Sequence, residues 1–314
     1  MLYNPFFKND FNFNVCFLTG NSLGNTKRSI QVFPEWIMER YSLHNQSFMM
    51  LAENKVNYDF LILPVSETVY DVISALDDRI KSAFSSGYAE VIKLTEKEIF
   101  QWLAIRVYGI LYNDISYAHM QLEDLQLSDY YLKSIKTINF LLQSLVIPFE
   151  FKKTPWSITI QKVKYSKDIF NYKDETKKLS VSLAMHDFGI IACLQDGGCI
   201  AEIERKLTSK LSGLVLHPIQ FEELWCRFIY SNYLLAAQNF TFTEGDGKII
   251  FDNKQDCKFE DWDDKIFSQV LANYWKPWGF TVDEIYQHPA SNISYLADEI
   301  TGEIVEPESI TLPW

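Results

Sequence analysis

The hydrophobic and polar positions of this 314-residue chain follow three patterns in succession. In residues 1–60, short apolar runs alternate with turn-forming residues. This pattern predicts strands at 15–18 and 31–33, and a helix that begins at Pro34, because proline needs no N–H partner in a first helical turn. In residues 69–147, apolar residues recur every three or four positions, which predicts helices that each bury one face.

The period changes after Pro148, which ends the last of these helices. Short apolar runs then predict strands at 156–163, 181–185 and 189–194. Two more helices and a hairpin are expected: a helix after Pro218, a hairpin around Gly245-Asp246-Gly247, and a helix from Asp261 or Asp263. The sequence therefore predicts an α+β fold. A ββα-like element with helices would occupy residues 1–148, and a mixed strand and helix half would occupy residues 149–314.

Composition limits the classes of function. Apolar residues make up 47% of the chain, which is enough for a packed core and excludes wholesale disorder. The net charge of -12 opposes a general nucleic-acid coat, because phosphate neutralisation supplies most non-specific affinity. However, residues 239–314 carry -10 of this charge and residues 1–238 carry only -2. The argument against nucleic acid therefore applies to the C-terminal end alone.

The cysteines and the absence of targeting patterns indicate a compartment. The five cysteines are odd in number and contain no Cys-x-x-Cys pair, which argues against a disulfide framework and favours a reducing environment. The N-terminus resembles no secretory signal, and no apolar run reaches the roughly 18 residues of a membrane span. We therefore expect a cytoplasmic protein without membrane contact. Phosphate-binding, dinucleotide-binding and nucleophile-elbow motifs are also missing, so we expect no cofactor.

One short pattern carries family information. It consists of Cys16-Phe17-Leu18-Thr19-Gly20 and, eleven residues on, Gln31-Val32-Phe33-Pro34-Glu35-Trp36-Ile37. This pattern resembles the opening of a bacterial group within the HNH, or His-Me finger, endonucleases. That group carries C-x-x-C-G and then E-H-V-F-P-x-W-L/I. Later pieces at 63–69, 100–103 and 108–112 are also similar, so the resemblance covers residues 14–117.

The sequence departs from the family pattern at the residues that would bind the metal and act as general base. The resemblance implies a zinc held by four cysteines, but only Cys16 is present and Thr19 replaces the second cysteine, so one thiolate cannot form the tetrahedral site. The family's histidine, which acts as general base or sits at the metal, is Gln31 here, and an amide cannot take a proton from water. The remnants of the motif are Cys16, Thr19, Gly20, Gln31, Pro34 and Trp36. They imply a degenerate relative without metal or nuclease activity, although an apolar core cysteine and a hydrophobic helix start would also explain the pattern.

Residues 152–178 form a basic strip, with eight lysines against three carboxylates and a net charge of +5. Aromatic residues lie between the lysines, and this mixture suits a single-stranded nucleic acid or an acidic partner. The candidate binding residues are Lys152, Lys153, Trp156, Lys162, Lys164, Tyr165 and Lys167. The alternative is a solvated edge strand whose lysines block aggregation.

Residues 239–314 form an acidic end, with five lysines against 15 carboxylates. Such a segment suits a basic protein partner or mimics the charge of nucleic acid, and it also serves solubility and helix capping. Among the histidines, His186 is followed by Asp187 and has Asp196 nearby in sequence, which is the best candidate for an acid/base unit. Adjacent residues of a strand point to opposite faces, which argues against direct pairing of His186 with Asp187.

Three functions remain open from the sequence. The first is a non-catalytic HNH-like interaction protein, associated with nucleic acid or with a bacterial defence system, that binds through the basic strip or the acidic end. The second is an enzyme whose site lies around His186, Asp187 and Asp196. The third is an acidic inhibitory or binding module for a basic protein.

Overall fold

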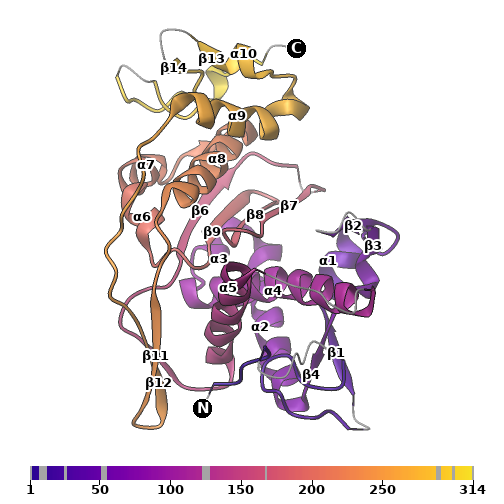
Figure 1. Cartoon of the computed structure of the whole chain (residues 1–314). Coiled ribbons are helices and arrows are strands. Elements are labelled where there is room, and N and C mark those ends of the chain that lie inside the picture. Colours follow the sequence, from indigo (N-terminus) through magenta and orange to yellow (C-terminus); the bar gives the residue numbers. More distant parts are fainter. Residues whose placement is uncertain are drawn as a thin grey trace. The chain divides into compact units, whose positions relative to one another are not determined.

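The computed structural model describes residues 2–6, 13–24, 27–50, 55–121, 128–166, 168–287, 291–298 and 301–312. The chain has an α+β fold divided into two compact units (Figure 1). The first unit contains Met1–Lys153 and Phe240–Asn253, and the second contains Thr154–Asn239 and Lys254–Trp314. The expected division at residue 148 differs from this one because residues 240–253 pair with a strand of the first unit.

The N-terminal element of the first unit contains a two-stranded sheet and a short helix. Strand β1 (Arg28–Gln31) pairs antiparallel with β4 (Ile62–Val65). The predicted helix is present as α1 (Glu35–Arg40) and begins one residue later than expected, because Pro34 is its extended N-cap residue. The predicted strand at 15–18 does not pair with β1, because the turn after it folds back so tightly that Val15 bridges Ser22. Between α1 and β4 lie β2 (Ser47–Met49), β3 (Lys55–Asn57) and the 3₁₀ helix η1 (Tyr58–Phe60).

Three long helices follow and confirm the predicted helical region: α2 (Glu67–Ser86), α4 (Glu96–Gln121) and α5 (Asp129–Leu142). A short helix, α3 (Tyr88–Val91), joins the first two, and η2 (Gln143–Leu145) follows the third. Helix α2 ends at Gly87, whose φ of 88° suits glycine. Before α4, the Thr95 N–H donates to Glu98 Oε2 at 2.8 Å and the Glu98 N–H donates to Thr95 Oγ1 at 3.2 Å, which together form a capping box. Helix α4 is buried on all sides between residues 99 and 113.

A three-stranded sheet completes the first unit in the order β11-β12-β5. Its strands are β5 (Phe149–Phe151), β11 (Phe240–Gly245) and β12 (Lys248–Asn253). The predicted hairpin is confirmed: β11 and β12 are antiparallel, and the turn residues Asp246 and Gly247 both have positive φ. Strand β12 runs parallel to β5, and Phe242 packs on Phe140 of α5 with ring centroids 5.3 Å apart. These contacts explain why a hairpin of the C-terminal half belongs to the first unit.

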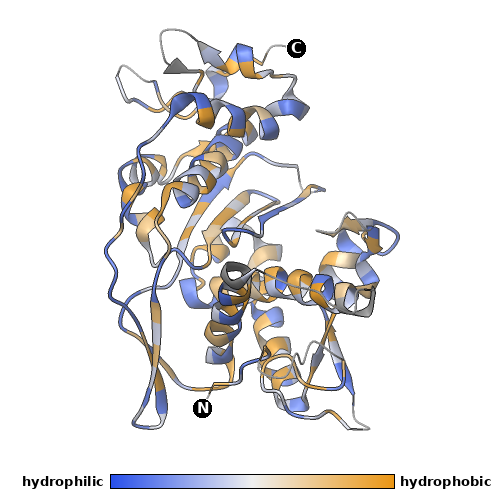
Figure 2. Cartoon of the chain, in the orientation of Figure 1, coloured by the Kyte–Doolittle hydropathy of each residue, from blue (hydrophilic) through white to orange (hydrophobic). Residues whose placement is uncertain are grey.

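The second unit is built on a five-stranded sheet of order β10-β6-β9-β8-β7. Its strands are β6 (Ser157–Val163), β7 (Phe170–Glu175), β8 (Ser180–Met185), β9 (Phe188–Cys193) and β10 (Val215–Leu216). Neighbours are antiparallel except for β10, which runs parallel to β6. Strands β6, β8 and β9 confirm the prediction, whereas β7 was not predicted. All residues of β8 and β9 are buried, and most of them are apolar (Figure 2).

Helices α6 (Cys199–Ile203), α7 (Arg205–Leu211) and α8 (Pro218–Leu234) share one hydrophobic core with this sheet. The close approach requires Gly189, because a Cβ there would lie 2.3 Å from Phe221 Cζ. Helix α9 (Asp264–Trp275) forms a second core with α8 and begins at the expected cap, Asp263. The chain ends with η3 (Lys276–Trp278), α10 (Val282–Ile285), β13 (Tyr286–Gln287), β14 (Ser291–Asn292) and η4 (Pro307–Ser309). Among the described residues, no helix is both long and apolar enough to cross a membrane.

A disulfide joins Cys199, the first residue of α6, to Cys257. The sequence argument against disulfides was therefore wrong at this pair. The two cysteines are 58 residues apart, and only the fold brings them together, since Leu235 at the end of α8 bridges Phe259 beside Cys257. Cys193, the cysteine nearest to Cys199 in sequence, is free and buried, as are Cys16 and Cys226.

Candidate functional site

The first group of motif residues lies in a tight turn. Cys16 is fully buried, and its N–H donates to the Asn21 carbonyl while its own carbonyl accepts from the Gly20 N–H, both at 2.9 Å. Gly20 has a φ of +69°, and a Cβ there would collide with the ring of Tyr3 at 2.3 Å. The Thr19 hydroxyl accepts from the Asn21 N–H at 3.4 Å. All of these interactions stabilise the turn itself.

The second group of motif residues, from Gln31 to Trp36, contacts helices α2 and α4. The backbone carbonyls of Gln31 and Val32 accept hydrogen bonds from Arg106 on α4, whose side chain is fully buried. Pro34 caps α1, and the Trp36 ring meets the Phe84 ring edge to face with centroids 6.3 Å apart. The retained motif positions thus contribute backbone geometry and packing. Within the described residues, His, Cys, Asp and Glu side chains form no group of three or more that could hold a metal ion.

Arg106, which binds the backbone of the motif residues Gln31 and Val32, lies outside the quoted motif. Its Nη2 donates to Asp77 Oδ1 of α2 at 2.7 Å, and the same oxygen accepts from Trp102 Nε1 at 2.7 Å. The guanidinium also lies 4.5 Å from the Trp102 ring centroid. A single arginine inside an apolar helical stretch was the available sequence signal, because a buried charge requires a partner.

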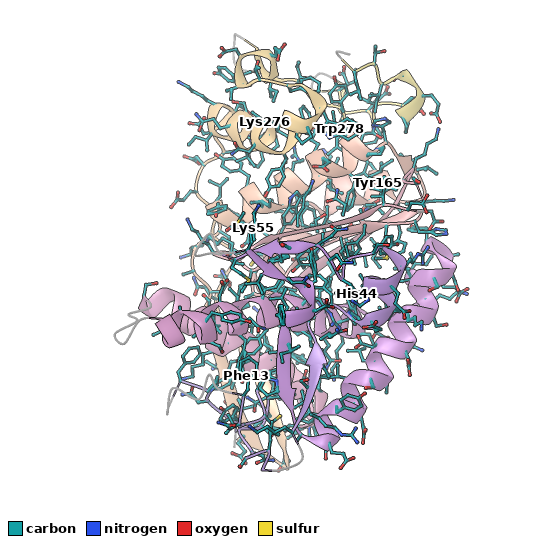
Figure 3. The ribbon with its side chains drawn as sticks, turned by 90° about the vertical axis from the view of Figure 1, so that its right-hand side faces the viewer. Phe13, His44, Lys55, Tyr165, Lys276 and Trp278 are labelled. Atoms are coloured by element: carbon teal, nitrogen blue, oxygen red, sulfur yellow. A yellow bond between two sulfur atoms is a disulfide. The ribbon has the colours of Figure 1, made fainter. Side chains whose placement is uncertain are left out.

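His44, labelled in Figure 3, follows α1 in the chain and contacts two carboxylates. Its Nδ1 is 2.8 Å from Asp59 Oδ1 and its Nε2 is 3.2 Å from Glu35 Oε1. The hydrogen bond to Asp59 raises the pKa of His44, with smaller contributions from the charges of Asp59, Glu35 and Glu39 against a lowering by burial. Because both ring nitrogens face carboxylates, the imidazole links α1 to η1 and leaves no nitrogen for a nucleophile or a metal.

The basic strip is divided by the fold. Lys152 and Lys153 belong to the first unit and the other described members to the second. Trp156 is only 5% exposed and the Tyr165 hydroxyl is buried, with burial raising the pKa of Tyr165. The sequence interpretation of Trp156 as a binding residue is therefore wrong, because a ring packed in the core offers no face on which a nucleic-acid base could stack.

The lysines of the strip differ in their surroundings. Lys162 is half-buried and Lys164 is exposed, whereas Lys167 lies outside the described residues. Lys173 forms an ion pair with Glu222, whose carboxylate is buried on α8. Lys178 donates to the Leu235 carbonyl at 3.2 Å, and burial lowers its pKa. The strip is therefore not one continuous cationic surface.

His186, Asp187 and Asp196 are not brought together. His186 and Asp187 form the turn between β8 and β9, so their side chains pair directly at 3.0 Å, contrary to the expectation for adjacent strand residues. Asp196 follows the other end of β9, a strand of six residues and hence on the order of 20 Å long. It accepts from the Ser157 hydroxyl and from the Ile200 N–H at 2.8 Å, and burial raises its pKa from 3.8 to about 6. These contacts give Asp196 a structural role at the start of α6.

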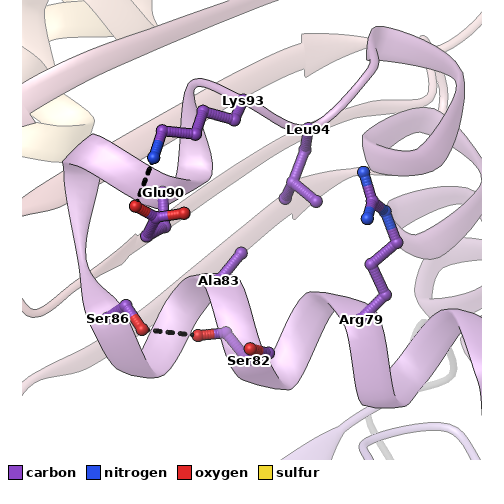
Figure 4. Close-up of a pocket in the computed structure, with 7 residues that line it drawn as sticks. All are labelled: Arg79, Ser82, Ala83, Ser86, Glu90, Lys93 and Leu94. Atoms are coloured by element: carbon purple, nitrogen blue, oxygen red, sulfur yellow. Dashed lines mark hydrogen bonds and ion pairs between the residues drawn. The ribbon is translucent and has the colours of Figure 1, made fainter.

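The first unit contains an open pocket of about 550 Å³ between α2 and the turn after α3 (Figure 4). Its two cations are already paired, Arg79 with Glu98 and Lys93 with Glu90. The Ser86 hydroxyl donates to the Ser82 carbonyl at 2.9 Å. The balanced charges give this pocket no preference for an ionic ligand.

The second unit contains a smaller pocket of about 200 Å³, at which α7, α8, α9 and residues 293–298 meet. We call it the Trp262 pocket. Its walls include the apolar side chains of Leu207, Phe267 and Leu296. The polar residues that line it are Glu223, Arg227, Asp264, Ser294 and Asp298.

Glu223 fixes one side of the Trp262 pocket. This carboxyl is 1% exposed and accepts hydrogen bonds from Ser294 Oγ at 2.6 Å, from the Tyr295 N–H at 2.7 Å and from the Leu296 N–H at 3.1 Å. Burial raises the pKa of Glu223 even though these hydrogen bonds oppose the shift. Glu223 therefore ties the C-terminal segment to α8.

Arg227 and Trp262 form the other side. The guanidinium lies 5.3 Å from the centroid of the Trp262 ring, and its Nε is 3.5 Å from Glu204 Oε2, which is an ion pair without hydrogen-bond alignment. The Trp262 ring meets the Tyr230 and Phe267 rings at 4.6 and 4.7 Å, and its Nε1 donates to Asp264 Oδ1 at 2.9 Å. The charge of Arg227 acts on Glu223 as well as on Glu204. The lining is acidic because its three carboxyls, those of Glu223, Asp264 and Asp298, outnumber this guanidinium.

Comparisons with protein-family models, with curated proteins and with solved structures found no match.

Proposed function

We propose that this chain is a non-catalytic interaction protein whose second unit binds a basic protein. The observation that carries the proposal is the acidic Trp262 pocket, which lies in the most acidic part of the chain. Residues 254–314 of the second unit contain four lysines against twelve carboxylates. A field of one sign steers an oppositely charged partner and favours its encounter.

Trp262 supplies the second element of a binding surface. Its residue surface is 37% exposed although its ring contacts Tyr230 and Phe267. The residues before and after it, Asp261 and Asp263, are exposed carboxylates. Tryptophan is enriched at the energetic centres of interfaces, where a large ring is desolvated by the partner. A positively charged partner surface would meet both the ring and its carboxylates.

For the first unit we propose an HNH-like scaffold that has lost its chemistry. The support is that Cys16 is buried in a turn and that the Gln31 backbone is held by Arg106. These residues have packing roles that need no metal. Purified protein incubated with plasmid DNA and Mg²⁺, Mn²⁺ or Zn²⁺ should leave the phosphodiester bonds intact. Cleavage that is lost in Gln31→Ala would contradict this proposal.

The enzyme hypothesis has less support, because His186 and Asp196 lie at opposite ends of β9. The basic-strip hypothesis also has less support, because Trp156 is buried. Residues 254–314 of the second unit carry a larger net charge than the basic strip of residues 152–178.

Binding to a labelled hexalysine peptide tests the proposal. We expect salt-dependent binding that weakens in the double variant Glu260→Gln/Asp261→Asn, both exposed residues of the second unit. The matched control is Asp71→Asn/Asp78→Asn, which removes two exposed charges from α2 in the first unit. Equal weakening in both variants would reduce the effect to net charge and overturn the proposal. Salt-dependent binding of single-stranded DNA that is lost in Lys162→Glu/Lys164→Glu would favour the basic strip instead.

A further inference from the structure

A histidine closes the base of the hairpin that β2 and β3 form in the first unit. Beyond the paired strands, the Tyr58 N–H donates to the Gln46 carbonyl at 3.3 Å. The next link toward the base is the contact between His44 Nδ1 and Asp59 Oδ1 at 2.8 Å. The same ring meets Glu35 Oε1 of α1 through its Nε2 at 3.2 Å. One imidazole therefore joins the two ends of the hairpin and holds them to α1.

This arrangement of the His44 ring depends on its protonation state. A neutral imidazole has one N–H donor, whereas the imidazolium has two. Since both nitrogens of His44 lie within hydrogen-bond distance of a carboxylate oxygen, the arrangement needs the imidazolium. A neutral ring would turn one nitrogen lone pair toward the oxygen lone pairs of Asp59 or Glu35, so it can keep only one of the two contacts.

The charges around His44 favour the proton. Among the described residues, the carboxylates of Asp59 on η1 and of Glu35 and Glu39 on α1 act on the ring. The hydrogen bond to Asp59 raises the pKa of His44 above 6.5, the three charges add to this shift, and burial opposes it. The closed hairpin thus binds the proton more tightly than an open one. Its stabilisation is complete below 6.5 and is lost as the pH rises through the folded pKa.

We propose that His44 is a proton-dependent clamp, whose imidazolium closes the base of the β2–β3 hairpin onto α1 and whose deprotonation lets the hairpin open. The hairpin covers Phe33, which is 1% exposed, with the rings of Phe48 and Tyr58 at centroid distances of 6.1 and 5.1 Å. An open hairpin uncovers this apolar ring. The proton on His44 therefore controls access to an aromatic surface of the first unit, independently of the basic partner proposed for the second.

The test combines two NMR measurements on the unmodified protein. Titration of the His44 ring signals gives its pKa, and hydrogen exchange of the Tyr58 amide gives the protection factor of the hairpin base, corrected for the intrinsic exchange rate. We expect a His44 pKa above 6.5. Linkage then fixes the second result: each unit of that pKa shift requires an about tenfold fall in Tyr58 protection between about pH 6 and about pH 9.

Three variants separate the clamp from a general effect of charge. His44→Gln cannot titrate, so Tyr58 protection should no longer depend on pH. Asp59→Asn should lower the pKa of His44 more than the matched control Glu39→Gln, because Glu39 acts on the ring only through its charge. His217 in the second unit is an internal reference, since its pKa is lowered, chiefly by burial, and should not move in these variants.

Three results would overturn the proposal. A His44 pKa at or below 6.5 would show that the two carboxylates do not hold an imidazolium. A raised pKa with constant Tyr58 protection would reveal an ion pair that does not close the hairpin. A pH dependence of Tyr58 protection that persists in His44→Gln would assign the effect to another group.

Discussion

The ion pair between Arg106 and Asp77 allows a quantitative test of how the first unit is held together. The Arg106 side chain is 0% exposed and Asp77 is 21% exposed. In Asp77→Ala, the guanidinium loses its carboxylate and Trp102 Nε1 loses its acceptor. Removing one partner of a buried ion pair costs about 3–5 kcal/mol. Because water reaches Asp77 in part, we expect the lower value, a loss of about 3 kcal/mol in the free energy of unfolding.

Urea unfolding followed by circular dichroism measures this loss. The two units need not unfold in one transition, so hydrogen exchange of α4 peptides identifies the transition of the first unit. The control is Asp78→Ala, the exposed neighbour on the same helix. A cost below about 1 kcal/mol for Asp77→Ala, close to that of an exposed salt bridge, would refute the buried pair. The double variant Asp77→Leu/Arg106→Met should recover much of the loss, since it leaves no charge unpaired.

Three further predictions concern the second unit. Cys257→Ser opens a loop of 58 residues and should cost about 4 kcal/mol in unfolding free energy, measured by urea titration; an unchanged midpoint would contradict the disulfide. Burial raises the pKa of Asp196 to about 6, so the folded state binds its proton more tightly than the unfolded state and stability should fall as pH rises from about 4 to about 6. Melting temperatures across this range should show the fall in the unmodified protein, and Asp196→Asn should flatten it. Gly189→Ala places a Cβ 2.3 Å from Phe221 Cζ and should lower the free energy of unfolding by about 1–3 kcal/mol. A melting temperature equal to that of the unmodified protein would contradict this and show that α8, which carries Phe221, can shift.

Local signals explain which elements could be predicted. The capping box of Thr95 and Glu98 and the cap at Asp263 depend on residues within three positions, and the helices begin there. The hairpin of β11 and β12 was likewise encoded by its turn. Strand β7 was missed because its sequence, FNYKDE, has no β-branched or aliphatic residue. Its stability comes from pairing with β8, which the sequence of β7 does not reveal.

Non-local contacts explain what could not be predicted. Glu223, near the start of α8, is buried and accepts hydrogen bonds from residues 294–296, about seventy positions further along the chain, which no local pattern indicates. The Trp262 pocket combines side chains from Leu207 to Asp298, with no spacing that a motif could capture. The partner of Cys199 was missed for the same reason. A sequence pattern reports on neighbours along the chain, whereas these groups meet only through the packing of distant elements in the two hydrophobic cores of the second unit.

The return of β11 and β12 to the first unit has a consequence for synthesis. The chain enters the first unit, leaves it at Lys153, comes back at Phe240 and leaves again at Asn253. During translation, β5 therefore stays unpaired until its partner β12 has been made, which is after most of the second unit has emerged from the ribosome. The first unit cannot be completed until Asn253 has emerged, and a fragment that stops at residue 153 would keep an unpaired edge with Phe149 and Phe151 uncovered by their neighbours. Synthesis of the first unit is thus completed after residues 154–239 of the second unit and before residues 254–314, which complete the second unit.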